Sequence, residues 1–255
     1  MSSLEVLAAV SFFATLLAGF AVGGRLLLLA RKTLRAAESF LGISTTTLAL
    51  AGAIEVLGLE LARAGKPTAA YPVEVFAIFL HCASSSSLCF GIWRVFHPDR
   101  RWAFYVCVVT SALLFDSWMA VVLPGRHTSV TGFTMWFHLN VAVRASASAW
   151  GAFEAFTHHR RLRRRLALGL ADRFTCHRFL LWSLALACTV AIFAAAFVTN
   201  VARHVLVFEW SPALLCVGVL GLCASWALWF AFLTPRFYRR WIEARSPLAA
   251  ADRLA

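Results

Sequence analysis

Long apolar runs separated by short polar segments make up almost the whole of this chain. Seven of these runs reach the length of about 20 residues that an α-helix needs to cross a bilayer. They cover residues 4–30, 40–62, 73–93, 102–123, 129–156, 179–200 and 213–233. The pattern predicts an all-α, seven-transmembrane helix bundle that forms a single membrane domain over residues 1–255.

Lysine and arginine are concentrated in alternate connections between the predicted spans. The inner connections and the C-terminal tail hold 18 of these residues and the outer loops hold four, while Arg25 and Arg144 lie within spans. Because positively charged residues are retained on the cytoplasmic side of a membrane, this asymmetry predicts an outside N-terminus and a cytoplasmic C-terminus. We expect the protein in a bacterial-type inner (plasma) membrane.

Composition strengthens this interpretation. Hydrophobic residues make up 61% of the chain and charged residues 14%, against about 45–50% and about 25% in soluble domains. The net charge of +12 comes from blocks between apolar runs, which form no continuous basic face of the kind that tracks a nucleic acid. We therefore expect lipid as the partner of these charges, and no nucleic acid.

The densest basic block follows the fifth predicted span. It contains five closely spaced arginines: Arg160, Arg161, Arg163, Arg164 and Arg165. We expect this loop to face anionic lipid headgroups or a cytoplasmic partner, with a homo-oligomer as a further possibility. The segment RRRLALGLAD is interpreted as a short interfacial helix that ends near Gly169.

Four ionisable residues lie inside four different predicted spans. Glu55, His81, Asp116 and His138 are each about seven to nine residues from the outer end of their span, which places them roughly 10–14 Å below the outer interface. Ionisable groups inside a bilayer are costly and frequently functional. We therefore interpret the four as candidates for a shared polar site in the outer half of the bundle.

Three chemistries fit such a site, and a fourth interpretation needs none. The first is a ligand-binding or proton-conducting pocket lined by these residues. The second is a zinc or iron site with His81 and His138 as ligands. The third is a haem with the two histidines as axial ligands. Alternatively, each residue only pairs with a neighbouring helix and satisfies its own hydrogen bonds.

Arg144 is the fifth candidate for ligand binding. It lies near the middle of its span, six residues after His138, so about 240° of helical rotation separates the two and we expect them on different faces. A buried guanidinium needs its own partner. We expect either a structural ion pair, for example with Asp116, or a clamp for an anionic ligand.

Two resemblances bear on function. Seven spans with an outside N-terminus resemble G-protein-coupled receptors and microbial opsins in topology alone. A retinal pigment would need a lysine in the last span, whereas the only lysines are Lys32 and Lys66. The stretch RLALGLADRFTCHRFLLW at residues 165–182, with TPRFYRRW near the C-terminus, is similar to a motif of uncharacterised seven-span bacterial membrane proteins, which implies a fold without a known activity.

From the sequence we expect a receptor- or sensor-like membrane protein with an outer-half polar pocket, and we assign no catalytic residue. The second hypothesis is a metal- or haem-dependent membrane enzyme or redox protein that uses the same residues. The third is a small-solute transporter.

Overall fold

In the computed structural model, residues 3–122, 135–203, 210–233 and 235–244 are described, and every regular element in these ranges is helical. The elements are α1 (Ser3–Thr33), α2 (Ala36–Arg63), α3 (Pro67–Phe96), α4 (Arg101–Val122), α5 (Met135–Ala167), α6 (Arg173–Arg203), α7 (Ser211–Leu228), the π-helical segment η2 (Trp229–Leu233) and α8 (Arg236–Ala244).

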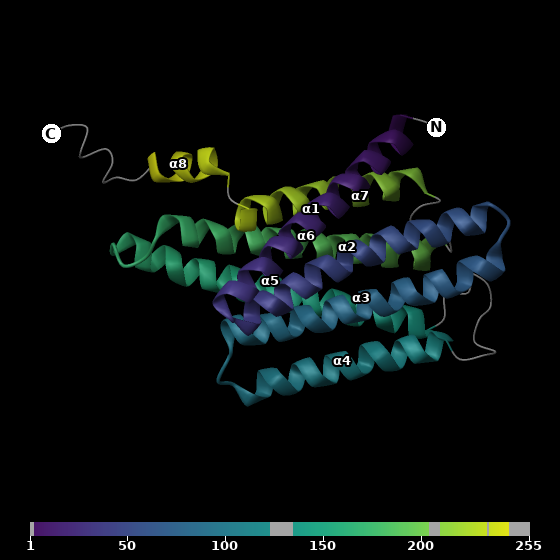
Figure 1. The fold of residues 1–255 in the computed structure, drawn as a ribbon, viewed down its shortest axis with the longest axis horizontal. Helices are drawn as coiled ribbons and strands as arrows, with labels where there is room; N and C mark the ends of the chain where they lie inside the picture. The colour runs from purple at the N-terminus through teal and green to yellow at the C-terminus, as the bar shows by residue number, and fades with distance from the viewer. Residues whose placement is uncertain (1–2, 123–134, 204–209, 234, 245–255) are drawn as a thin grey trace.

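The helices form a closed ring in chain order. Each of α1 to α6 contacts the next helix along the chain, and α7 returns to contact α1. Helix α3 also contacts α5 directly, so α4 lies toward the outside of the ring. Figure 1 shows the seven long helices side by side, with the start of α1 and the short α8 at opposite ends of the bundle.

Among the described residues, six helices are long and apolar enough to cross a membrane. They are α1, α2, α3, α4, α6 and α7 together with η2. The all-helical prediction is thus confirmed, and the chain is a multi-pass membrane protein. Helix α5 is not among the six: the predicted span 129–156 begins outside the described residues, and the described part of α5 carries the arginine block.

The polar ends of the predicted spans continue as helix. Helix α5 runs without interruption through the arginine block to Ala167, so the prediction of a separate short helix there was wrong. Arginine and leucine are good helix formers, which is why the turns continue beyond the apolar run. The predicted stop is confirmed: Gly169 has φ +72°, and the N–H of Leu170 donates to the carbonyl of Arg165 at 2.9 Å, as in a Schellman C-cap.

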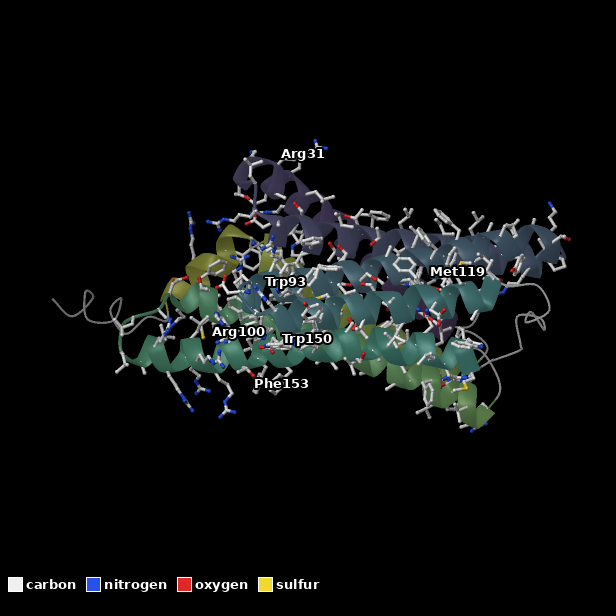
Figure 2. The ribbon with its side chains drawn as sticks, turned by 90° about the horizontal axis from the view of Figure 1, so that it is seen from below. Arg31, Trp93, Arg100, Met119, Trp150 and Phe153 are labelled. Atoms are coloured by element: carbon white, nitrogen blue, oxygen red, sulfur yellow. The ribbon has the colours of Figure 1, made fainter. Side chains whose placement is uncertain are left out.

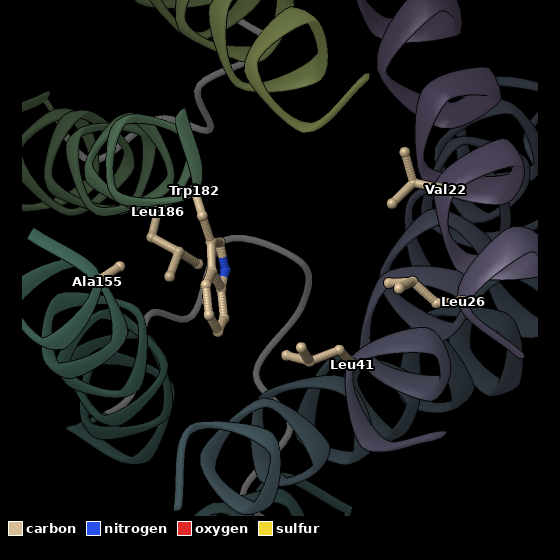
Figure 3. Close-up of a cluster of buried hydrophobic side chains, with 6 residues drawn as sticks. All are labelled: Val22, Leu26, Leu41, Ala155, Trp182 and Leu186. Carbon is tan, nitrogen blue, oxygen red and sulfur yellow. The ribbon is translucent and has the colours of Figure 1, made fainter. Parts of the chain in front are cut away.

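The core lies where several helices meet around Trp182. This side chain of α6 is only 6% exposed and belongs to one cluster with Val22, Leu26, Leu41, Ala155 and Leu186. Figure 3 shows its indole pointing from α6 toward the middle of the bundle, with α1 and α2 on the far side. Apolar packing across the ring therefore joins helices that are distant in the chain.

Close helix approaches occur at small residues. A Cβ added to Gly23 of α1 would collide with Thr46 Oγ1 of α2 and lie 2.9 Å from its backbone nitrogen, whereas a Cβ on Gly24 would meet nothing within 4 Å. Where α1 meets α7, a Cβ on Gly218 of α7 would lie 3.4 Å from Cβ of Ser11, which is 1% exposed. Small residues thus let the backbones approach at both contacts of α1.

Two arginines bind the carbonyl groups at the end of α7. Nε of Arg178 donates to the carbonyl of Ala231 at 2.9 Å, and Nη1 of Arg25 donates to the carbonyl of Leu233 at 2.9 Å. Both carbonyls belong to η2. A π-helical turn changes the backbone pairing locally, and here α1 and α6 supply the donors.

Candidate functional site

Glu55 and His81 form the centre of the candidate site. Oε2 of Glu55, on α2, lies 3.2 Å from Nε2 of His81, on α3. The His81 side chain is 11% exposed and the Glu55 side chain 47% exposed. The predicted meeting of these two groups is therefore found in the structure, and one member of the pair remains accessible.

Arg144 approaches this pair from another part of the ring. It belongs to α5, which is separated from α2 by α3 and α4 in chain order, yet its guanidinium lies within electrostatic range of Glu55 and His81. Its guanidinium carbon lies 4.7 Å from the ring centroid of Phe193 on α6. Attraction to the aromatic face holds the cation on the α6 side.

Two buried nitrogen atoms in this group have no hydrogen-bond partner among the described residues: Nδ1 of His81 and Nε of Arg144. Buried polar atoms in proteins are nearly always satisfied, so each exception calls for an explanation. These nitrogens are available to a water molecule or a ligand. Since Glu55 is accessible, such a molecule would find an acceptor, an imidazole and a guanidinium together.

His138 lies elsewhere on α5. Its ring is 5.4 Å from that of Phe197 on α6, and Phe197 follows Phe193 by one helical turn. His138 and Arg144 therefore both contact the same stripe of α6, although we expected them on different faces. About 120° of helix surface separates them by the shorter way, and their long side chains reach sideways across it.

The structure does not bring Asp116 to the other candidates. Asp116 on α4 is exposed, whereas the next residue, Ser117, is fully buried. Neither the ion pairs of the described residues nor the charge interactions of Arg144 include it. The sequence predicts one depth for the four residues, but helical phase turns Asp116 away from the Glu55–His81 pair.

Asn140 is a buried polar residue that the sequence reasoning missed. It is 3% exposed on α5, and its Nδ2 donates to Oγ of Ser117 at 2.8 Å and contacts the thiol of Cys82 at 3.2 Å. It therefore joins α3, α4 and α5 directly beside the candidate site. An amide within an apolar run was the available signal, and only ionisable residues had been considered.

A second contact that the sequence reasoning missed lies near the middle of α5. Nε2 of His97 and Oε1 of Glu154 are 2.9 Å apart, an ion-pair contact whose angle is not that of a hydrogen bond. Nε1 of Trp150 donates to the same carboxylate oxygen at 3.3 Å. Figure 2 shows Trp150 with Trp93, Arg100 and Arg31 toward one end of the bundle and Met119 toward the other. This pair fastens the α3–α4 connection to α5 away from the candidate site.

The described residues contain no group of three or more His, Cys, Asp or Glu side chains that could hold a metal ion. Binding of zinc, iron or haem through His81 and His138 stays a prediction. The chemistry that the observed geometry offers is proton sharing between Glu55 and His81 and anion binding by Arg144.

No family model, no curated protein and no solved structure matches this chain. The similarity of residues 165–182 to a motif of seven-span bacterial proteins therefore remains an observation on the sequence.

Proposed function

We propose that this chain is a receptor- or sensor-like protein of seven spans that binds a small solute with an anionic group at Glu55, His81 and Arg144. The seventh span is α5 together with the residues that precede it. Its position between α4 and α6 in the ring supports this assignment, since all its neighbours are apolar helices.

The proposed orientation places the N-terminus outside and the C-terminus in the cytoplasm. The distribution of lysine and arginine along the sequence supports it. The positions of α1 and α8 at opposite ends of the bundle are consistent with an odd number of crossings (Figure 1). The arginine-rich end of α5 would then be available to anionic lipid or to a cytoplasmic partner.

The proposed site rests on the incomplete hydrogen bonding of the Arg144 guanidinium. A guanidinium within an apolar bundle is costly, and such residues usually mark a functional position. Its Nε has no hydrogen-bond partner among the described residues, while its charge acts on an accessible carboxylate. An anionic group would complete the hydrogen bonding of Arg144, and donor groups of the same solute would bind Glu55.

A ligand screen by thermal unfolding tests this function. The purified protein would be heated with acetate, succinate, glutamate or inorganic phosphate. We expect at least one of these anions to raise the Tm of the wild type in a saturable way, because a ligand that binds only the folded state stabilises it. Arg144→Gln should abolish the shift.

Arg63→Gln is the matched control, because Arg63 is an exposed partner of Glu60 at the end of α2. It removes the same charge and should leave the shift unchanged. A panel without any Arg144-dependent shift would overturn the proposed site. Uptake of the stabilising anion into proteoliposomes would identify the protein as a transporter in place of a receptor.

A further inference from the structure

We propose that the arginine-rich end of the bundle contains a binding cavity for the phosphate group of an anionic phospholipid. The cavity has a volume of about 290 Å³ and lies between the end of α5, the start of α6 and α8. It is distinct from the Glu55–His81–Arg144 group, and neither proposal depends on the other.

Basic side chains from two helices line this cavity. Arg163 and His159 come from α5, and Arg173 and His177 come from α6. Guanidinium groups bind phosphate oxygens with paired N–H donors. Cations that converge from separate elements define a concave site, in contrast to a solvated row of charges along one helix.

The position of His159 is fixed by α6. Its Nδ1 lies 2.9 Å from the carbonyl oxygen of Cys176 and 3.3 Å from the thiol of that residue. Because a carbonyl can only accept, Nδ1 carries the proton and Nε2 is the remaining nitrogen of the ring. The ring is thus oriented by the backbone of one wall, as expected in a preformed site.

Apolar side chains complete the lining and favour a lipid over a free phosphate. Leu166 of α5, Leu180 of α6, and Trp241 and Ile242 of α8 line the same cavity. Ile242 is 2% exposed, so α8 is packed against the bundle at this position, whereas Trp241 is 46% exposed. A ligand with a charged head and an apolar tail matches this division, and basic pockets between membrane helices suit such headgroups.

A neighbouring cavity has a different lining and does not qualify as a headgroup site. It is lined by Arg160, Arg163, Arg164 and Ala167, all from α5. Among the described residues only α5 contributes to its lining, and Ala167 is the one apolar side chain there. We interpret that surface as a solvated basic face that attracts anionic membranes without binding one headgroup.

Thermal unfolding in vesicles of defined composition tests the proposal. The full-length protein would be reconstituted in phosphatidylcholine alone and in phosphatidylcholine with increasing phosphatidylglycerol. We expect Tm to rise with the phosphatidylglycerol fraction and to saturate. The double variant Arg163→Gln/Arg173→Gln should lose most of this rise.

The matched control is Arg31→Gln/Arg35→Gln, which removes two exposed charges near the α1–α2 connection. It should keep the saturable rise. Equal loss in both double variants would mean general surface attraction and would overturn the proposal. If the first variant does not fold, Arg163→Gln alone provides the comparison, with a weaker saturable rise expected.

Inorganic phosphate added to the Arg144→Gln variant in phosphatidylcholine distinguishes the two sources of phosphate, because this variant lacks the Arg144 site. We expect no shift at millimolar concentration. A shift as large as that from phosphatidylglycerol would assign the cavity to a soluble phosphate compound and overturn the lipid proposal. This experiment leaves the Arg144-dependent ligand screen untouched, so the two proposals can fail separately.

Discussion

A few polar side chains give this apolar bundle its candidate site. Glu55 and His81 pair across α2 and α3, Arg144 interacts with both from α5, and Asn140 joins three helices beside them. In hydrocarbon, an unmade hydrogen bond is not compensated by water. Each of these residues therefore either forms its hydrogen bonds within the protein or has a donor or acceptor available for a ligand.

His158 offers a test at the residue scale. It follows the predicted span 129–156, and its ring lies 4.4 Å from that of Phe179. Burial lowers its pKa below the usual value of 6.5, and Arg161 and Arg165 lower that pKa further. The folded state therefore binds the proton more weakly than the unfolded state does.

The sign of the pH effect follows from this difference. The contribution of His158 to stability is fully present above about pH 6.5 and declines as the pH falls toward its lowered folded pKa. Unfolding midpoints measured from pH 8 to pH 5 should fall more steeply for the wild type than for His158→Gln. Parallel curves would contradict this role for His158.

At the scale of elements, the contact of α1 with α2 depends on one glycine. Gly23→Ala should lower the free energy of unfolding by about 1–3 kcal/mol, since the added methyl group meets Thr46 and the backbone behind it. Reversible unfolding in mixed micelles measures this change. Gly24→Ala is the control: its Cβ has open space, so alanine should be neutral or slightly stabilising. Equal effects at both positions would refute the predicted close approach.

The helices themselves could be predicted from apolar length, but their ends could not. The arginines after residue 159 interrupt hydrophobicity without interrupting helix formation, so α5 extends to Ala167. Counting residues also predicted a similar depth for Glu55 and His81, whereas their contact depends on the rotation of α2 and α3. Asp116 shows the limit of that reasoning: depth follows from counting residues, whereas direction requires the rotation of each helix, which depends on packing against neighbours.

At the scale of the whole molecule, the orientation can be tested with reporter fusions. Alkaline phosphatase fused after Gly65 should be active, because we expect this connection outside the cytoplasm. The same enzyme fused after Asp99 should be inactive, while green fluorescent protein at that site should fluoresce. The reverse pattern would contradict the orientation predicted from lysine and arginine.

The contact of α1 with α7 also has a consequence for biosynthesis. Ser11 is covered by Gly218, a residue 207 positions later in the chain. At about 5–20 residues per second, the ribosome needs roughly 10–40 s to make the intervening polypeptide. During that interval the first helix has already left the ribosome while the surface that receives the last one is still uncovered. A nascent chain of this protein therefore completes its ring only after α7 has been made.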